Sequence, residues 1–255
     1  MLEFDAMKKG KTLVVGHRGA YGYAPENTMP SFEKGLKCGS DLLELDIHES
    51  LDGELIIMHD SEVDRTTDGS GPIENMTISQ IKKLDAGIKF DIKFKGTRVP
   101  LLRELLDWAH NRIPLVIEIK GNPFPAAGIE KKLIRMLKEY NLISETMVIS
   151  FHHECMKLFK QAEPALATGL LLMGELVDPL HALESCNSDS WRPGWQYWTK
   201  EKVELVQKSG ATASTWNADV ESVMDKIVPM GLASIGSNFP DRLRNYIDKC
   251  GRDYK

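Results

Sequence analysis

Two of the three histidines among the first 60 residues stand close in the sequence to an arginine and to two closely spaced carboxylates. They are His17 and Arg18, then Glu44 and Asp46, and finally His59. An imidazole titrates near neutral pH and can transfer protons, whereas a guanidinium can form two parallel hydrogen bonds with a phosphate group. Carboxylate oxygens bind hard divalent cations. This combination indicates metal-assisted chemistry on a phosphate ester.

Two further charged residues, Glu118 and Lys120, end a later apolar segment. Residues two apart on a strand point to the same face, so these two side chains should lie together. Oxygen ligands without a Cys/His cage favour Mg²⁺ or Ca²⁺ over zinc, and we expect Glu44, Asp46 and Glu118 to hold one such cation. Lys120 joins Arg18 as a candidate phosphate-binding group. A plain ion pair between Glu118 and Lys120 is the alternative interpretation.

A predicted β-hairpin brings part of this set together. Apolar and polar residues alternate before Asp52, which predicts a half-buried strand, and the residues after Gly53 predict its returning partner. Asp52 and Gly53 then form a two-residue loop, and in that register Asp46 faces His59. Glu44, Asp46 and His59 would share one face of the hairpin, and a slip of one residue would separate them.

The rest of the chain alternates short apolar segments with amphipathic ones. Eight predicted strands, each followed by a helix, begin near residues 12, 42, 115, 147, 168, 191, 211 and 232. Eight βα units in 255 residues predict a (β/α)₈ TIM barrel, with a small insertion subdomain after strand two at about 50–110. We expect residues 1–255 to form a single domain. An open doubly wound sheet is the alternative, but the chain has no G-x-G-x-x-G phosphate loop.

In such a barrel the chemistry lies at the carboxyl ends of the strands. The predicted first strand ends at His17 and Arg18, and the seventh ends at Trp216. Trp216 is a candidate to line the substrate site, and simple packing is an equal alternative. Asn217 and Asn238 follow strands seven and eight.

Composition and charge exclude several classes of partner. The net charge of −5 gives no basic field for nucleic acid or for an anionic membrane. No apolar run approaches the roughly 20 residues of a transmembrane helix, and no secretory signal precedes the first strand, so we expect a cytoplasmic protein. The four scattered cysteines are expected to be reduced thiols. The sequence leaves a monomer and a homo-oligomer both open.

An ordered set of motifs resembles the glycerophosphodiester phosphodiesterases. The motifs are GHRG at 16–19, PENT at 25–28, ELD at 44–46, DG at 52–53, HD at 59–60, RTT at 65–67 and IEIK at 117–120. The resemblance runs from about residue 12 to residue 248. It implies a TIM barrel with a small insertion after strand two. It also implies hydrolysis of a glycerophosphodiester, a small-molecule substrate, to an alcohol and sn-glycerol 3-phosphate, and hence a part in lipid and glycerol metabolism.

The resemblance also implies a role for each candidate residue. His17 and His59 would be the acid/base pair, and the three carboxylates would hold one divalent cation, Mg²⁺ or Ca²⁺. Arg18 and Lys120 would bind the phosphate, and Trp216 would line the glycerol or leaving-group side. Two routes stay open: attack by the substrate's own glycerol hydroxyl to give a cyclic phosphodiester, and direct attack by water. The preferred alcohol also stays open.

The second half of the chain departs from the family pattern. Asn217 follows Trp216 where many members have threonine, and Asn238 stands where many have aspartate. Three alternatives stay open, and the departures motivate the second of them. One is lysophospholipase D-type hydrolysis of lysophospholipids, with the tryptophans of 191–198 as an apolar rim. The second is a non-catalytic barrel that binds phosphoesters, and the third is a lyase-type barrel with Lys120 as base.

Overall fold

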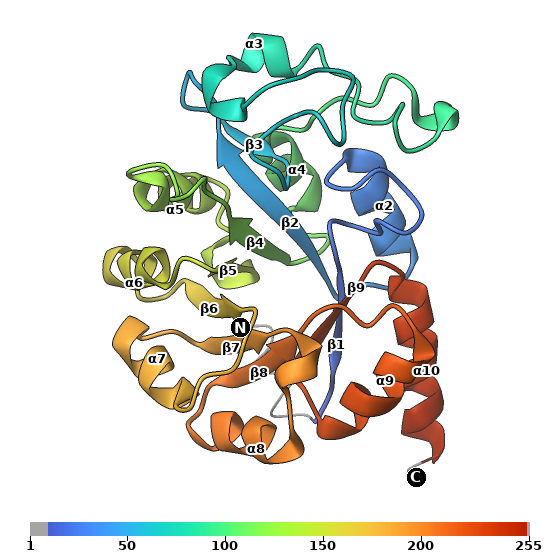
Figure 1. Ribbon diagram of the computed structural model, residues 1–255, viewed down its shortest axis with the longest axis vertical. Coiled ribbons are helices and arrows are strands. Elements are labelled where there is room, and N and C mark those ends of the chain that lie inside the picture. The colour runs from blue at the N-terminus through green and yellow to red at the C-terminus, as the bar shows by residue number, and fades with distance from the viewer. Residues whose placement is uncertain (1–9, 254–255) are drawn as a thin grey trace.

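A computed structural model describes residues 10–253 of the chain. Within them the barrel strands follow the order β1-β9-β8-β7-β6-β5-β4-β2, and pairing of β1 with β2 closes the ring. The strands are β1 (Leu13–Gly16), β2 (Leu42–Glu49), β4 (Leu115–Ile119), β5 (Thr146–Ser150), β6 (Ala167–Leu172), β7 (Ser190–Pro193), β8 (Thr212–Thr215) and β9 (Ser234–Ser237). All eight run parallel, so the predicted (β/α)₈ barrel is confirmed (Figure 1).

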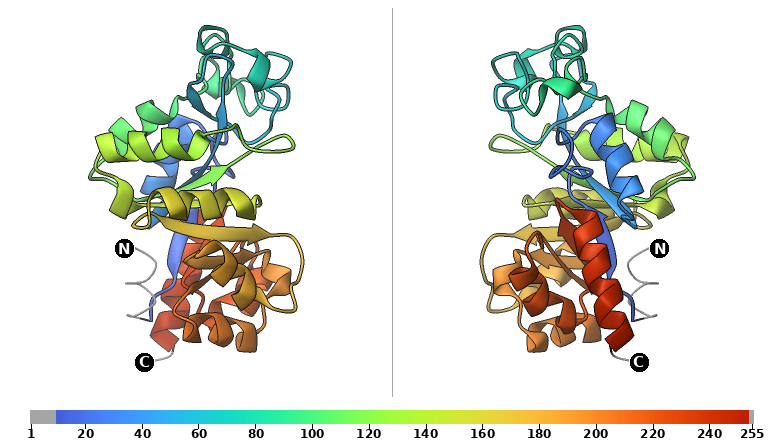
Figure 2. Two further views of the ribbon diagram at one scale, coloured as in Figure 1. Left: turned by 90° about the vertical axis from the view of Figure 1, so that its left-hand side faces the viewer. Right: turned by 90° about the vertical axis from the view of Figure 1, so that its right-hand side faces the viewer.

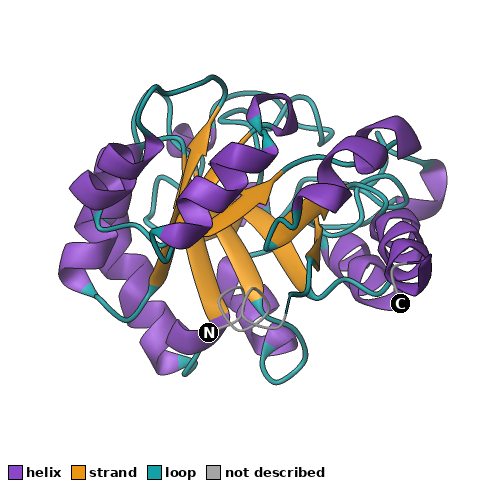
Figure 3. Ribbon diagram, turned by 90° about the horizontal axis from the view of Figure 1, so that it is seen from below, coloured by secondary structure: helices purple, strands orange, loops and turns teal. Residues whose placement is uncertain are grey.

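In the described part of the chain, eight α-helices surround the barrel (Figure 3). They are α2 (Met29–Lys37), α4 (Leu102–Ala109), α5 (Ile129–Glu139), α6 (His153–Ala162), α7 (Pro179–Cys186), α8 (Lys200–Lys208), α9 (Glu221–Ile227) and α10 (Pro240–Asp253). Short 3₁₀ helices lie at Ile73–Asn75, Ile92–Phe94, Ile143–Glu145, Trp195–Tyr197 and Val228–Met230. Each α-helix packs one apolar face on the strands, as α5 does with Ile129, Leu133 and Leu137. Among the described residues, no helix combines the length and the apolar character needed to cross a membrane.

Strand β2 shows why the acidic side chains point into the barrel. Its residues Leu43, Leu45 and Ile47 are fully buried in the large core between strands and helices. Because side chains alternate across a strand, Glu44 and Asp46 face the interior of the barrel. The alternating pattern of the sequence therefore determines the direction of both carboxylates, as predicted.

The register of the hairpin is one residue away from the predicted one. β2 pairs with the antiparallel strand β3 (Leu55–Ile57), which lies outside the barrel, and Ile47 is opposite Ile57. The prediction that Asp46 faces His59 is therefore wrong. A slip of one residue reverses the face of every side chain on the returning strand, so strand pairing alone does not explain where His59 lies.

The hairpin loop accounts for the shift. The backbone N–H of Ser50 donates to the carbonyl of Glu54, and that of Gly53 donates back to Ser50, each at 2.9 Å. The loop thus has three residues, 51–53, and Gly53 adopts a left-handed conformation with φ +82°. His59 still reaches the barrel because β3 ends two residues before it and the chain turns away from the strand.

The segment between β3 and α4 projects from one side of the barrel, beyond β2 and β3, at one end of the molecule's long axis (Figure 2). It contains the short helix α3 (Ile78–Ile81) and a small apolar core of its own. That core consists of Ile56, Met58, Val63, Ile73, Ile81, Ala86 and Val99. Helix α4 packs instead in the main core of the barrel.

The predicted aromatic strand near 191–198 is shorter than expected. β7 ends at Pro193, which has no N–H to extend a strand ladder, and the 3₁₀ helix Trp195–Tyr197 follows. Trp191 and Trp198 are buried in the main core, and the indole N–H of Trp198 donates to the Ser214 carbonyl at 3.2 Å. Trp191 and Trp198 are therefore packing residues and do not form the apolar surface that the sequence predicted for them, and the half-buried Trp195 packs against the same core.

Candidate active site

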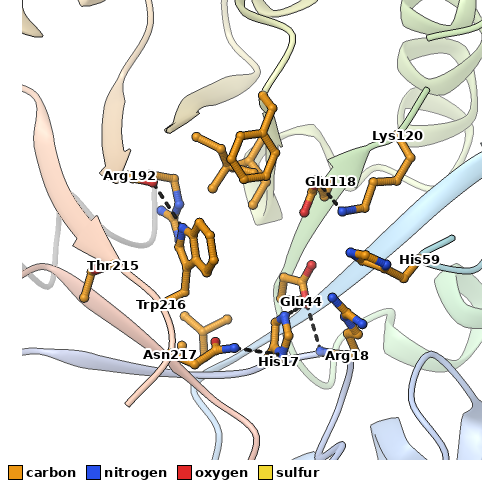
Figure 4. A pocket seen from close by; sticks show the side chains of 15 residues that line it. His17, Arg18, Glu44, His59, Glu118, Lys120, Arg192, Thr215, Trp216 and Asn217 are labelled. Atoms are coloured by element: carbon orange, nitrogen blue, oxygen red, sulfur yellow. Dashed lines mark hydrogen bonds and ion pairs between the residues drawn. The ribbon is translucent and has the colours of Figure 1, made fainter. Parts of the chain in front are cut away.

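A cavity of about 180 Å³ opens at the carboxyl ends of the barrel strands (Figure 4). Seven of the eight side chains predicted from the sequence line it: His17, Arg18, Glu44, His59, Glu118, Lys120 and Trp216. The eighth, Asp46, is fully buried directly behind Arg18 and Lys120. Four strands, β1, β2, β4 and β8, and the chain after β3 thus converge on one cavity.

The three carboxylates form a compact oxygen cluster. One oxygen of each of Glu44, Asp46 and Glu118 lies within 4.8 Å of the others. Asp46 and Glu118 are neighbours because they pair directly in the parallel ladder of β2 and β4. Burial, together with repulsion from Asp46, raises the pKa of Glu44 well above its ordinary value and that of Glu118 to about 7.

Two cationic side chains lie beside this cluster. Lys120 Nζ is 2.6 Å from Glu118 Oε1 and 3.0 Å from Asp46 Oδ1, and Arg18 Nε is 3.3 Å from Asp46 Oδ2. Burial alone would raise the pKa of Asp46, but Lys120 and Arg18 hold it below its ordinary value. The Glu118–Lys120 ion pair considered from the sequence is therefore present, as part of a larger charged cluster.

The cluster fits a hard divalent cation. Its donors are carboxylate oxygens at one end of a cavity, which is the ligand set that Mg²⁺ and Ca²⁺ prefer. The raised pKa values of Glu44 and Glu118 show that the protein alone does not compensate their buried charge. A bound cation would supply that compensation and displace the protons.

His17 is held by one amide side chain and lies beside a second one. Asn238 Oδ1 lies 2.6 Å from Nδ1 and accepts its hydrogen bond. Asn217 Nδ2 lies 3.2 Å from the same nitrogen and, being a donor itself, makes no hydrogen bond to it in this tautomer (Figure 4). Asp219 holds Asn238 in turn, accepting from its side-chain amide at 2.7 Å. With the proton on Nδ1, Nε2 is free on the side of Glu44, 3.9 Å away. Burial and the charge of Arg18 lower the pKa of His17 to about 4, so the ring is neutral at pH 7.

His59 is held by a charged partner instead. Its Nδ1 lies 2.6 Å from Asp60 Oδ1, and its backbone carbonyl is 3.1 Å from Nε2 of the buried His48. Burial lowers the pKa of His59, assisted by Lys120 and Arg18, whereas the nearby aspartates oppose this shift. The contact with Asp60 directs Nε2 of His59 away from the carboxylate and toward the cavity that His59 lines.

Several polar residues of the site had no predicted role. Glu26 pairs with Arg18 at 2.8 Å, and Asn27 donates to Asp46 at 2.7 Å. Both belong to the PENT motif, and Asp60 and Arg65 belong to the HD and RTT motifs. The motifs therefore marked these residues in the sequence, but the sequence does not show which of their side chains contact one another.

Across the cavity the lining is mostly apolar. Trp216 meets the Phe151 ring edge-on at 5.9 Å between centroids, and its indole N–H donates to the Arg192 carbonyl at 3.1 Å. Arg192 also lines the cavity, and its side chain uses space that a Cβ at Gly169 would fill. Arg192 was missed because the irregular pattern around β7 hid its inward direction.

Exposed apolar side chains also lie on the loops that follow β4, β5 and β6. We call this set the apolar rim, and its members are Phe124, Phe151, Met173, Leu176 and Val177. Each is more than a third exposed. Of the five rim residues, Phe151 also lines the cavity.

Comparison with known proteins agrees with this geometry. Residues 17–242 match the glycerophosphoryl diester phosphodiesterase family. A glycerophosphodiester phosphodiesterase of Caldanaerobacter subterraneus subsp. tengcongensis is 38% identical over 94% of this chain and 100% of its own length.

Two solved structures share the fold. The glycerophosphodiester phosphodiesterase of Agrobacterium tumefaciens superposes with a TM-score of 0.79 at 28% identity, covering 92% of this chain and 99% of its own. An Oleispira antarctica phosphodiesterase in complex with the product sn-glycerol-3-phosphate gives a TM-score of 0.86 at 25% identity, covering 95% and 99%.

Proposed function

The chain belongs to the glycerophosphoryl diester phosphodiesterase family and is a phosphodiester hydrolase. From this premise we propose that it hydrolyses glycerophosphodiesters to an alcohol and sn-glycerol 3-phosphate, using one divalent cation and two histidines. The observation that carries the proposal is the single cavity that joins three carboxylates, two imidazoles and two cationic side chains. This inventory matches the needs of phosphoryl transfer: charge neutralisation, orientation and proton transfer.

Glu44, Asp46 and Glu118 are the proposed ligands of Mg²⁺ or Ca²⁺, with the fit described above. When bound, the cation supplies Lewis-acid stabilisation of negative charge on the phosphate oxygens. Arg18 and Lys120 place two fixed positive charges at the same cavity, and the neighbouring carboxylates keep both of them protonated. Their contribution is to orient the phosphate and to oppose its developing charge.

The two histidines have different surroundings, which suit them to different roles in proton transfer. His17 is neutral with Nε2 free, so it is proposed to accept the proton of the attacking hydroxyl. His59 lies beside Asp60, whose pKa is lowered to about 2, mainly by hydrogen bonds from Arg65. Burial lowers the pKa of His59, but the ionised Asp60 opposes that shift by stabilising the imidazolium, so His59 is proposed to donate a proton to the leaving oxygen. The same pair serves attack by the glycerol hydroxyl or by water.

Trp216 is proposed to pack against the carbon skeleton of the glycerol or of the leaving group. Its ring is fixed on two sides, by the hydrogen bond to Arg192 and by the Phe151 ring. A large planar apolar surface in one orientation suits the carbon face of a small polyol.

The test is product release from glycerophosphocholine with added Mg²⁺ or Ca²⁺. The wild-type chain should release sn-glycerol 3-phosphate and choline, and Asp46→Asn, which removes a ligand charge at nearly constant volume, should reduce that rate at least about 10³-fold. Release of phosphocholine and glycerol instead would show cleavage on the other side of the phosphorus. Equal rates for wild type and Asp46→Asn would show that the cluster is not the reaction centre.

The apolar rim favours one second candidate function, lysophospholipase D-type hydrolysis of lysophospholipids. An acyl chain on the glycerol needs apolar surface next to the reacting phosphate, and the rim begins inside the cavity at Phe151. The reacting groups would be unchanged. The family and the complete set of charged side chains leave no support for a non-catalytic barrel.

A further inference from the structure

Arg65 lies in the segment after β3, outside the cavity, and binds two carboxylates with one guanidinium. Its Nε is 2.6 Å from Asp60 Oδ2, and its Nη2 is 3.1 Å from Asp60 Oδ1. Its Nη1 is 2.8 Å from Glu26 Oε2, and the same Nη2 is 2.7 Å from Glu26 Oε1. These four hydrogen bonds form two bidentate pairs, which define the position and the plane of all three groups.

Each of these carboxylates also accepts a hydrogen bond from a side chain that lines the cavity. Asp60 accepts the Nδ1–H hydrogen bond of His59 at 2.6 Å, and Glu26 accepts from Nη1 of Arg18 at 2.8 Å. Arg65 therefore stands midway in a chain of contacts from His59 to Arg18. These two cavity residues come from different elements, the chain after β3 and the end of β1.

The two cavity residues at the ends of this series of contacts, His59 and Arg18, depend on other side chains to hold their positions. His59 follows a three-residue strand and is not held by the hairpin ladder. Arg18 adopts a left-handed backbone conformation with φ 49°, which is unfavourable for a side chain other than glycine. Such a conformation persists only where the surrounding contacts determine it, and Glu26 is one of those contacts.

We propose that Arg65 is a positioning residue that holds the proton-transfer group His59 and the phosphate-binding group Arg18 in one fixed relative geometry. This inference rests on the proposed function, which gives the two side chains their roles. Arg65 touches neither the cavity nor the carboxylate cluster, so it acts only through Asp60 and Glu26. A lysine would keep the charge but cannot form two planar bidentate pairs.

A plain surface ion pair is the competing interpretation of Arg65. Its side chain is 44% exposed, and exposed pairs contribute little on their own. Glu26, however, is buried, and loss of Arg65 would leave it with Arg18 as its one remaining ion-pair partner among the described residues. Arg18 would then be drawn toward an uncompensated buried charge, which changes its position as well as the local stability.

The test compares Arg65→Gln and Arg65→Lys with the control Arg103→Gln. Arg103 is 49% exposed and pairs with Glu54, so the control removes a similar exposed ion pair away from the cavity. With glycerophosphocholine and saturating cation, both Arg65 variants should lose about 10- to 100-fold in kcat/KM, with kcat lowered and KM raised. Arg103→Gln should stay within about 2-fold of wild type. Arg65 variants that match the control would overturn the inference.

A second readout separates positioning from stability and does not require activity. ¹⁵N chemical shifts of His59 should show a single Nδ1–H tautomer in the wild type and in Arg103→Gln, and a mixture of tautomers in Arg65→Gln. An unchanged tautomer in a folded Arg65→Gln would contradict the inference. An inactive wild type would refute the proposed function, and the tautomer measurement would still decide whether Arg65 orders His59.

Discussion

The two sides of the cavity are built on different principles. The charged side comprises Glu44, Asp46, Glu118, Lys120, Arg18 and the two histidines, from β1, β2, β4 and the chain after β3. The apolar side comprises Trp216, Leu171 and the apolar rim, from the strands and loops of β4 to β8. Hydrogen bonds and ion pairs between side chains are numerous on the charged side and few on the apolar side.

This difference follows from what each side must accommodate. Asp46 alone contacts Asn27, Arg18 and Lys120, because a buried charge is tolerated only when partners satisfy it. Such a cluster has one geometry, which suits a phosphodiester group that is the same in every substrate. Exposed apolar side chains such as Phe124 and Val177 impose no fixed geometry, so we expect this side to receive different alcohols or an acyl chain.

The largest effects should come from the histidines of the charged side. His17→Ala and His59→Ala should each lower kcat by about 10² to 10⁴, because each removes a proton-transfer group. The double variant should lose much less than the product of the two single losses, since groups that act in one step are not additive. The measurement is the rate of sn-glycerol 3-phosphate release. A loss below about 3-fold for either histidine would remove it from the mechanism.

A smaller and selective effect is expected on the apolar side. The double variant Met173→Ser/Val177→Ser should lower kcat/KM for lysophosphatidylcholine about 10-fold and leave glycerophosphocholine within about 2-fold, because only the lipid has an acyl chain to bury. The assay compares both substrates below micelle-forming concentrations. Leu205→Ser, an exposed position on α8, is the matched control. Equal losses on both substrates would show that the rim stabilises the fold or contacts the glycerol group that both substrates share.

The sequence predicted the elements and the contents of the charged side because both follow from local patterns. The alternation around Glu44 and Asp46 determines which face each side chain occupies, and the order of strands brings Glu118 beside Asp46. Barrel topology then places the strand ends His17 and Trp216 at the same opening. These inferences need only the period of a strand and the direction of a parallel sheet.

Details that depend on contacts between distant segments could not be predicted. The hairpin register depends on whether the loop has two or three residues. The Asp52-Gly53 sequence is compatible with either loop length. The Arg65–Glu26 contact joins residues 39 apart through two irregular loops. Arg192 points inward only because Gly169, on the neighbouring strand, leaves space for it. Local patterns do not encode such pairings.

The central claim is that Glu44, Asp46 and Glu118 hold a divalent cation. Their acidity makes this claim testable by pH without an activity assay. The pKa of Glu118, raised to about 7, and that of Glu44, also raised, lie above the values of an unfolded chain. In the metal-free folded chain these two carboxyls therefore hold extra protons, and the stability that they contribute is lost as pH rises from about 4.5 to about 7, whereas the lowered pKa of His17 acts in the opposite direction. A cation displaces those protons, so it binds more tightly above this range than below it.

The most direct measurement is the rise in melting temperature on adding Mg²⁺ or Ca²⁺ to metal-free protein, at about pH 8 and at about pH 5. We predict a clear rise at the higher pH, a much smaller one at the lower pH, and none in Asp46→Asn at either pH. Titration calorimetry should give one cation per chain with release of protons near neutral pH. A rise that is independent of pH, or that persists in Asp46→Asn, would contradict the claim.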